Sequence, residues 1–457
     1  MPEQNVSPSL DVDDEEEDNR SIIINDEADQ EFLSEPIHFG PESQDDDEDD
    51  DDGEEMKLSA KMALLDFRGR IEDAILSNYL VYNKKKNDTE KVIFSKRNLE
   101  NQRDMTLWGV PLLSSKGHQG TDVVLMSFLK ARDYKVAEAF KALRKVLRWR
   151  TKHRVDGILD EEFSPEVENM WFTNGKDRKG RPICYQVLGN FKKKDLQREI
   201  WGTHNQHRKE LVRWRIQCLE KGIRLLDFKP GAQHSLVLVT DLRNSPGTAM
   251  KEVRWITRKM LRIVQDNYPG LIYKNIVINV PIWYSTFHAF NLRVIQQRSK
   301  TKFIFVKPAR VTDTLLRYIP AEQLQVHYGG IKRDIDDEFS PEDKVLEETL
   351  KPSIISTIKI PANQVDMTIT WDWMVVGNEV MYKEEFVPED DCSYNVLLQS
   401  DKKLTGLVRN SFHIREPGEI AITIHNLTSK KKRAFYRSKT KPSVYQFTRS
   451  TSDPIPS

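Results

Sequence analysis

Cysteine is scarce in this chain, and long apolar runs are missing from it. The three cysteines among 457 residues, Cys184, Cys218 and Cys392, are scattered, which fits neither a disulfide framework nor the paired spacing of a metal site. No apolar run approaches the ~20 residues needed to span a bilayer. The N-terminus lacks the basic start and apolar core of a signal peptide. We therefore expect a reduced, cytoplasmic protein without a membrane-spanning segment.

Motifs for catalysis are also missing. The sequence contains no phosphate-binding loop of the G-x-x-x-x-G-K type, no nucleophile elbow and no HExxH motif. His204 and His207 stand three residues apart and could face one way on a helix, but a pair of surface histidines is the simpler interpretation. We expect a protein that is not an enzyme and that uses no cofactor and no metal.

The net charge of −1 hides a strong segregation of charge along the chain. Residues 1–56 hold 24 acidic residues and one basic residue, a net charge of −23, whereas the other residues carry 69 basic against 47 acidic side chains, or +22. An acidic segment of this kind cannot bury enough apolar surface to fold, and we expect a disordered tail. A body this basic points to an anionic partner, which could be a membrane surface, a nucleic acid or the tail itself.

Helical periodicity dominates the chain from the tail to residue 158. A helix and a polar linker are predicted over residues 57–103, and a helical lobe over residues 104–158, in which Asp122 is a plausible N-cap. The helix through residues 136–150 has one apolar face and one basic face, the second of which carries Lys135, Lys141, Arg144, Lys145 and Arg148. A solvated face is a simpler interpretation of these basic residues than a membrane-binding one.

Strands alternate with helices between residues 159 and 335. Helices are predicted at 205–228 and 248–267, and four short apolar strands at Ile183–Leu188, Ser235–Leu242, Asn275–Val280 and Lys302–Val306. This alternation predicts an α/β domain with a mainly parallel sheet. Between the last two strands, helical spacing links Trp283, Phe287, Phe290 and Val294. So apolar a helix suggests a movable lid over an apolar interior, although an ordinary core helix would show the same stripe.

Short alternating strands follow in residues 336–445. Met367–Val376, Tyr394–Leu398 and Ile420–Ile424 alternate apolar and polar residues and are separated by polar turns. This pattern predicts a small all-β sandwich, followed by a C-terminal tail at 446–457.

The motifs of the α/β region resemble those of the Sec14-like (CRAL-TRIO) lipid-transfer domain. The resemblance lies in the pattern DNYP…IN-P…SK…IP-E-L…YGG within residues 266–330, and in FLKARDYKV at 128–136 followed by Trp149-Arg150 in the helical lobe. The sandwich in this position resembles a GOLD domain. An acidic tail, a Sec14-like domain and a GOLD domain together resemble the patellins.

The resemblance implies a site for a lipid headgroup. In phosphatidylinositol-binding relatives, basic residues of these motifs hold the phosphoinositol group, and they correspond here to Arg132 and Lys302, with Ser299 as a supporting hydroxyl. Two departures, Asp133 and Gly270, each remove an anticipated headgroup contact. The resemblance also implies that the apolar stripe at 283–294 is the lid of the cavity. Read from spacing alone, Arg132 would be a helix-end ion pair with Asp133, and Lys302 an ordinary flanking charge.

We also assign Tyr268, in the Tyr-Pro-Gly turn of the DNYP motif, to the residues of the cavity and lid.

A second basic site lies near the C-terminus. Seven basic residues occur in twelve positions, interleaved with two aromatic residues: Lys430, Lys431, Lys432, Arg433, Arg437, Lys439 and Lys441. Each could contribute about 1 kcal/mol against an anionic leaflet, and the aromatic residues could settle at the interface. A nuclear-import run or a nucleic-acid patch would have similar composition. Because a hairpin of a β-sandwich is poorly placed to read bases, we expect membrane binding and no nucleic-acid partner.

The function predicted from these features is that of a lipid carrier at membranes. The resemblance implies binding of phosphatidylinositol or a phosphoinositide, peripheral membrane association, and a part in vesicle trafficking that extends to the cell plate in cytokinesis. One alternative is a lipid-sensing adaptor that recruits trafficking proteins through the GOLD domain. Another is a carrier of a tocopherol-like or sterol-like ligand. The apolar triplet Ile22, Ile23 and Ile24 in the acidic tail resembles a SUMO-interacting motif and could add a strand to a partner's sheet.

Overall fold

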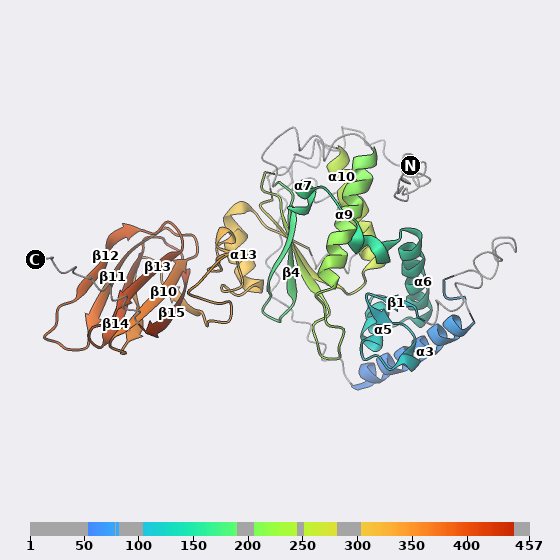
Figure 1. Cartoon of the computed structure of the whole chain (residues 1–457), viewed down its shortest axis with the longest axis horizontal. Helices are drawn as coiled ribbons and strands as arrows, with labels where there is room; N and C mark the ends of the chain where they lie inside the picture. The colour runs from blue at the N-terminus through green and yellow to red at the C-terminus, as the bar shows by residue number, and fades with distance from the viewer. Residues whose placement is uncertain are drawn as a thin grey trace, which may run out of the picture. The chain divides into compact units, whose positions relative to one another are not determined.

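The computed structural model of the chain describes residues 54–77, 79–81, 104–189, 205–244, 251–280 and 303–442. The chain divides into two compact units, one of Met1–Asn174 with Lys179–Pro308 and one of Gly175–Arg178 with Ala309–Ser457 (Figure 1). The predicted acidic tail up to residue 53, its isoleucine triplet and the C-terminal tail lie outside the described residues. None of the helices within the described ranges is both long enough and apolar enough to cross a bilayer.

Helices and two short strands open the first unit. They are α3 (Glu54–Leu76), β1 (Thr106–Leu107), β2 (Val110–Pro111), η3 (Ser114–Lys116), α5 (Gly120–Lys130), α6 (Val136–Lys152), η4 (Val155–Asp160) and α7 (Pro165–Glu168). Helix α3 contacts both α5 and α6 and buries Phe67, Ile71 and Ile75 there. The prediction of Asp122 as an N-cap was wrong. Its carboxylate lies in the first turn of α5, and it forms an ion pair of 2.7 Å with Arg68 of α3 instead.

A five-stranded sheet completes the first unit. Its elements are β3 (Trp171–Lys176), β4 (Pro182–Val187), α9 (Asn205–Ile223), β5 (Leu236–Asp241), α10 (Lys251–Asn267), β6 (Ile272–Ile278) and β7 (Phe303–Phe305). The strand order is β3-β4-β5-β6-β7, and the pairs from β4 to β7 are parallel. The predicted α/β fold is therefore confirmed. Strand β5 is buried over its whole length, as a central strand covered on both faces should be.

Helix α9 approaches the sheet closely at Gly222. A Cβ atom at this position would lie 2.9 Å from Sγ of Cys184 on β4 and 3.1 Å from a methyl group of Leu236 on β5. A larger residue would collide with these side chains, so they or the helix would have to shift. Trp214 and Cys218 of the same helix are buried beside it. This contact fixes the position of α9, which carries Glu220 of the buried network described below.

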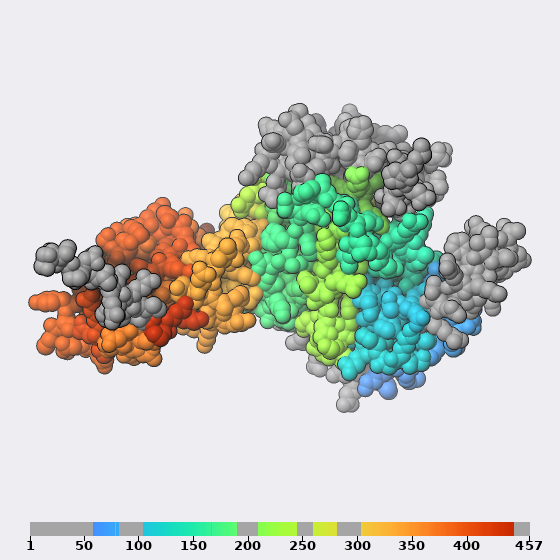
Figure 2. All heavy atoms as spheres, in the orientation of Figure 1, coloured from blue at the N-terminus to red at the C-terminus, as the bar shows by residue number. Residues whose placement is uncertain are grey.

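The second unit is an antiparallel sandwich preceded by short helical turns. After η5 (Pro308–Arg310), its elements are α13 (Val311–Tyr318), η6 (Val326–Tyr328), β8 (Leu346–Leu350), β9 (Ile355–Ala362), β10 (Met367–Val375), β11 (Val380–Pro388), β12 (Val396–Lys403), β13 (Val408–His413), β14 (Gly418–Asn426) and β15 (Lys432–Pro442). One sheet has the order β13-β10-β15-β8 and the other β12-β11-β14-β9. The predicted all-β sandwich, orange to red in Figure 2, is confirmed.

Aromatic side chains fill the sandwich. Trp371 and Trp373 of β10 are fully buried, and Phe386 of β11 is nearly so. Trp373 donates its indole N–H to the buried carboxylate of Glu384 over 2.6 Å, so one polar pair is satisfied inside the core. The sequence predicted a domain boundary between residues 335 and 336, whereas the compact units divide between residues 308 and 309.

Candidate functional site

The candidate headgroup residues are only partly described. Arg132 follows the C-terminal end of α5, is half-buried, and donates from Nη1 to the carbonyl oxygen of Ala131 over 3.1 Å. The next residue, Asp133, is exposed and has a left-handed backbone with φ of 51°. Lys302 and Ser299 lie outside the described residues, as do the lid residues Trp283, Phe287, Phe290 and Val294. The headgroup and lid assignments therefore stay predictions.

The backbone explains the glycine at position 270. Gly270 has φ of 75°, a conformation that favours glycine, and a Cβ atom there would lie 3.2 Å from the side chain of Ser127 on α5. A glutamate at this position would be strained. Glycine at this position therefore suits both the backbone conformation and the limited space beside α5.

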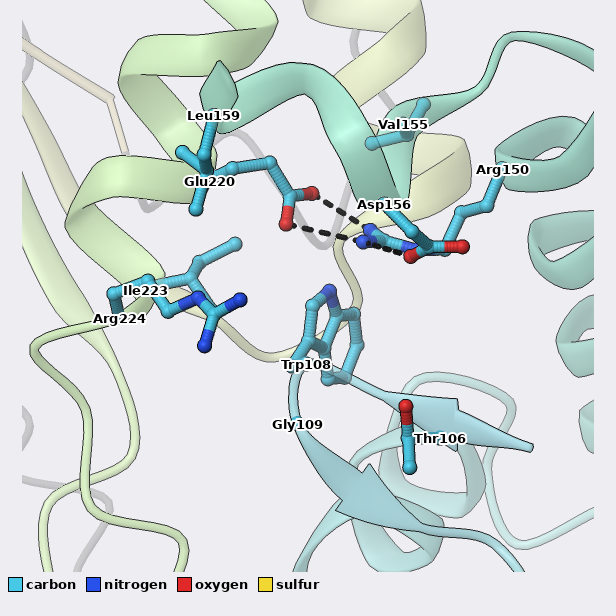
Figure 3. Close-up of a pocket in the computed structure, with 10 residues that line it drawn as sticks. All are labelled: Thr106, Trp108, Gly109, Arg150, Val155, Asp156, Leu159, Glu220, Ile223 and Arg224. Carbon is cyan, nitrogen blue, oxygen red and sulfur yellow. Dashed lines mark hydrogen bonds and ion pairs between the residues drawn. The ribbon is translucent and has the colours of Figure 1, made fainter. Parts of the chain in front are cut away.

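Arg150 and Glu220 form a buried ion pair between α6 and α9 (Figure 3). The guanidinium group of Arg150 donates to both oxygens of Glu220, over 2.6 and 3.1 Å, and pairs with the exposed carboxylate of Asp156 over 2.7 Å. The hydroxyl of Tyr268 donates to the same carboxylate of Glu220 over 2.8 Å. Because Tyr268 is buried and faces a carboxylate, its pKa lies well above the ordinary value. Tyr268 thus serves to join the turn before β6 to α9.

A small cavity of about 180 Å³ lies beside this ion pair (Figure 3). Its walls come from β1 and the following turn, η4 and α9, with Trp108 and Arg224 facing the ion pair across it. A water molecule takes about 30 Å³ in the liquid, so the cavity has room for roughly six waters. Two acyl chains would not fit there, and we do not assign it to the lipid.

Two basic residues of α6 bind the backbone that follows α3. Arg144 donates to the carbonyl oxygens of Leu80 and Tyr79, over 2.8 and 2.9 Å, and Arg148 donates to that of Val81 over 2.7 Å. These carbonyls lie beyond the last residue of α3, Leu76, so they need hydrogen-bond partners from outside a helix. This part of the basic face therefore has a structural role in the helical lobe, which the sequence does not show.

The seven basic residues near the C-terminus do not form one patch. Lys430 and Lys431 are exposed in the turn before β15, whereas Lys439 and Lys441 lie near the end of that strand. A strand rises about 3.4 Å per residue, so these two pairs are some 30 Å apart. Arg437 is 3% exposed, and its inclusion in a membrane surface was wrong. Most of the others are paired with carboxylates: Lys432 with Glu379, Arg433 with Glu347, Lys439 with Asp343 and Lys441 with Glu338.

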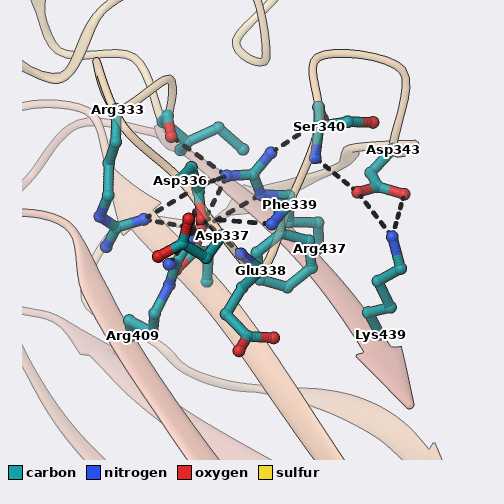
Figure 4. A network of polar contacts seen from close by, with 12 residues as sticks. Arg333, Asp336, Asp337, Glu338, Phe339, Ser340, Asp343, Arg409, Arg437 and Lys439 are labelled. Carbon is teal, nitrogen blue, oxygen red and sulfur yellow. Dashed lines mark hydrogen bonds and ion pairs between the residues drawn. The ribbon is translucent and has the colours of Figure 1, made fainter. Parts of the chain in front are cut away.

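Arg437 belongs to a network that ties the segment before β8 to the sandwich (Figure 4). Asp372 of β10 has no exposed surface, and it accepts hydrogen bonds from Arg333, Arg409 and Arg437 over 2.7 to 2.9 Å. Asp336 accepts from Arg409 over 2.7 Å and from Arg437 over 3.1 Å. The face of Phe339 also packs against the guanidinium groups of Arg437 and Arg409.

We expect the second unit to lose stability as the pH falls below about 4. Burial alone would raise the pKa of the Asp336 carboxyl, but hydrogen bonds from Arg409 and from the backbone N–H groups of Phe339 and Glu338 outweigh it and hold the pKa well below its ordinary value. The unfolded chain therefore binds a proton at a higher pH than the folded chain does. The stabilisation is complete above the unfolded pKa and is lost as the pH drops towards the folded one.

Denaturant unfolding at several pH values below 6 would check this dependence. In Asp336→Asn it should be shallower than in the parent chain. An equally steep dependence in both proteins would show that other carboxylates are responsible.

Comparison with known proteins agrees with both folds. The sequence profile of the CRAL/TRIO domain matches residues 167–330, and that of the patellin-1-like C-terminal GOLD domain matches residues 351–432. Patellin-4 of Arabidopsis thaliana is 45% identical over 343 residues, which are 74% of this chain and 62% of that protein. Patellin-6 of the same plant is 35% identical over 338 residues, which are 73% of this chain and 81% of that protein.

A more distant relative is the phosphatidylinositol transfer protein SFH5 of Candida albicans. It is 27% identical over 240 residues, covering 49% of this chain and 72% of that protein. The first unit and the sandwich thus define a Sec14-like protein with a GOLD domain. The chain belongs to the patellin family. Its match spans less than two thirds of the length of Patellin-4.

Proposed function

We propose that this protein is a carrier that binds a phosphatidylinositol-like lipid in its first unit and acts at anionic membranes in vesicle trafficking, including cell-plate formation. The main support is the CRAL/TRIO match over residues 167–330, which covers the parallel strands β4 to β7. The similarity to a relative named for phosphatidylinositol transfer supports the same proposal. The proposal includes a cytoplasmic location, peripheral membrane association and a binding activity without catalysis.

The energetics of such a carrier constrain where its selectivity arises. Burying two acyl chains stabilises the bound lipid by some 20 kcal/mol or more, at about 0.8 kcal/mol per methylene. The donor bilayer provides a similar stabilisation, so exchange between cavity and bilayer needs no ATP. The headgroup must then provide the discrimination, through charge-assisted hydrogen bonds to phosphate oxygens. Arg132 and Lys302, supported by Ser299, are the groups that we propose for this role.

Transfer of labelled lipids between vesicles tests the proposal. In Lys302→Ala, transfer of phosphatidylinositol should fall about tenfold, because a hydrogen bond to a charged group is lost, while transfer of phosphatidylcholine should change little. Lys307→Ala is the matched control. Lys302 precedes β7 in the sequence, whereas Lys307 follows this strand and is exposed. Equal loss for both lipids in Lys302→Ala would contradict a headgroup role.

A lipid-sensing adaptor is the second candidate function. It is favoured by the sandwich, which with its preceding segment forms a compact unit with a core of its own. In that case the protein would retain lipid without moving it between vesicles, and the sandwich would recruit trafficking proteins. A complete absence of transfer for both phospholipids, with lipid still bound after purification, would favour this function. A bound tocopherol-like or sterol-like molecule would instead identify a different cargo.

A further inference from the structure

Four turns meet at one end of the sandwich. They connect β8 to β9 at residues 351–354, β10 to β11 at 376–379, β12 to β13 at 404–407, and β14 to β15 at 427–431. The strand register places them together, since Ile355 pairs with His425, Val380 with Asn426, and Lys432 with Leu350. We call this the lysine end of the sandwich.

The two ends of the sandwich carry opposite charge. The four turns at the lysine end contain three lysines, Lys351, Lys430 and Lys431, against one carboxylate, Glu379. The adjoining strand ends add Lys402, Lys403 and Lys432, of which Lys432 is nearly buried and pairs with Glu379. The carboxylates of these strand ends are Asp401 and Glu348, each of which is exposed and stands third from the end of its strand. The turns at the opposite end contain five carboxylates against one arginine: Asp366, Glu389, Asp390, Asp391 and Glu416, with Arg415. Such a distribution of charge orients the sandwich in the field of an anionic surface, with the lysine end leading.

Large apolar side chains are exposed among these lysines. Ile354, Ile355 and Leu427 have 48%, 60% and 57% of their surface exposed. The first two precede and begin β9, and the third follows β14, so they lie on neighbouring turns. The N–H of Asn426 donates to the carbonyl of Ile354 over 3.3 Å, and that of Ser353 to the carbonyl of Thr428 over 3.2 Å.

A buried asparagine holds the two turns in place. The side-chain amide of Asn426, which has no exposed surface, donates to the carbonyl oxygens of Lys351 and Lys430 over 3.0 and 2.9 Å. Its carbonyl oxygen accepts from the backbone and hydroxyl of Thr428. The exposed apolar groups and lysines are therefore presented by a braced turn pair, so docking would cost little ordering of the backbone.

We propose that the lysine end is the docking surface of this protein for an anionic bilayer. Ile354, Ile355 and Leu427 enter the headgroup region, while the surrounding lysines face the lipid phosphates. Apolar burial combined with attraction to anionic lipid is the combination that holds peripheral proteins at a membrane. The inference rests on the proposed action at membranes, and it names the surface and its partner. The scarcity of carboxylates among the apolar groups favours an anionic bilayer over a basic protein partner.

Charge variants at the two ends of one strand test the docking surface. The double variant Lys430→Ala/Lys431→Ala should bind vesicles of phosphatidylcholine with phosphatidylserine about 25-fold more weakly than the parent chain, at about fivefold per lysine. The matched control is Lys439→Ala/Lys441→Ala, which removes two lysines at the other end of β15 and should bind within about twofold of the parent. Binding by the parent chain should weaken as salt is added. Equal losses in both double variants would overturn the proposal.

The cysteines of the chain allow insertion to be measured directly. Cys392 is exposed in the turn between β11 and β12, at the end opposite the lysines, whereas Cys184 and Cys218 are buried. Burial raises the pKa of the Cys184 thiol to about 12, and that of Cys218 well above its ordinary value, so a thiol reagent should label Cys392 in the folded protein.

An environment-sensitive dye would compare the two ends of the sandwich. Attached at Cys392 of the parent chain, the dye should not respond to phosphatidylserine vesicles. Attached to Leu427→Cys in a Cys392→Ser background, it should shift to the blue and be quenched by spin-labelled acyl chains. If the labelled protein binds the vesicles while the dye at residue 427 stays in water, insertion is overturned. If the protein binds only an acidic protein and no vesicles, the choice of partner is overturned.

Failure of this inference can be told apart from failure of the carrier proposal. The variants of residues 430 and 431 should keep the lipid that copurifies with the parent chain, since that lipid is bound in the first unit. Lys302→Ala should instead lose inositol-lipid transfer while it still docks on vesicles. Loss of docking by Lys302→Ala, together with intact docking by the lysine-end variants, would overturn the assignment of the docking surface without bearing on the cargo.

Discussion

Replacing Asp372 with alanine should lower the free energy of unfolding of the sandwich by about 3–5 kcal/mol, as expected for removing one partner from a buried ion pair. The carboxylate of Asp372 is fully buried and accepts hydrogen bonds from Arg333, Arg409 and Arg437. Arg437 is itself almost fully buried. Without Asp372, the three guanidinium groups would share the single carboxylate of Asp336, and one would be left without a counter-ion in a low-dielectric site.

Calorimetry of the full chain would measure this loss in the unfolding transition of the second unit. Asp343→Ala is the control. Its carboxylate pairs with the exposed Lys439 and accepts from the backbone N–H of Ser340 over 2.8 Å, so the change should cost no more than about 2 kcal/mol. A shift for Asp372→Ala as small as that of the control would show that solvent or a rearranged arginine replaces the lost carboxylate.

Glu220→Ala should destabilise the first unit to a similar degree, by about 3–5 kcal/mol. Arg150, which is 4% exposed, would lose its bidentate partner, and the hydroxyl of Tyr268 would lose its acceptor. Arg150 would keep only its second acidic partner, the exposed carboxylate of Asp156. The side chain of Asp156 is 71% exposed, so it should compensate only weakly.

A double variant distinguishes the cost of leaving one charge without a partner from the contribution of the whole ion pair to the free energy of unfolding. Arg150→Met/Glu220→Leu removes both charges and keeps much of the volume, and it should recover most of the stability that Glu220→Ala loses. Asp156→Ala serves as the control, with an expected cost below about 1 kcal/mol. Chemical denaturation of the parent chain, Arg150→Met, Glu220→Leu and the double variant would give the coupling energy of the pair. If the double variant were as unstable as Glu220→Ala, the two charges would contribute more as a pair than apolar packing does.

The sequence predicts the long helices of the first unit and gives bounds for seven of the fifteen strands that the structure describes, because burial imposes a period on these segments. The four strands β4 to β7 are short apolar runs, and alternation identifies β10 and β14. The two-residue strands β1 and β2 escaped prediction, since two residues are too few to show a period. The strands β3, β8, β9, β11 and β13 were also missed. The same limit applies to caps. Asp122 had the right residue type for an N-cap, but its distant partner Arg68 decided its role.

Charge patterns in the sequence are harder to interpret than apolar ones. A run of basic residues in a strand alternates between its two faces and extends over tens of ångströms, so neighbours in sequence serve different surroundings. Arg437 faces a buried carboxylate on β10, whereas Lys430 and Lys431 precede the strand and are exposed. The carboxylates that pair with this strand come from residues about 50 to 100 positions earlier, so no local sequence pattern predicts them. Lys351, Lys402 and Lys403 join the lysine end only through strand pairing.

The arginine network also determines which part of the chain can be transferred to another protein as one folding unit. The GOLD profile covers residues 351–432 and leaves out both β8 and nearly all of β15. Asp336 and Phe339, which contact Arg437, lie before β8, and Arg333 lies within three residues of the end of the CRAL/TRIO match. A gene fusion that transferred only the profile region would lack β8 and nearly all of β15, two neighbouring strands of one sheet, and also Asp336, which pairs with Arg409 of the same sheet. A transferable unit therefore has to begin before β8, beside the last residues of the CRAL/TRIO match. We expect the CRAL/TRIO and GOLD profiles to occur together in related chains.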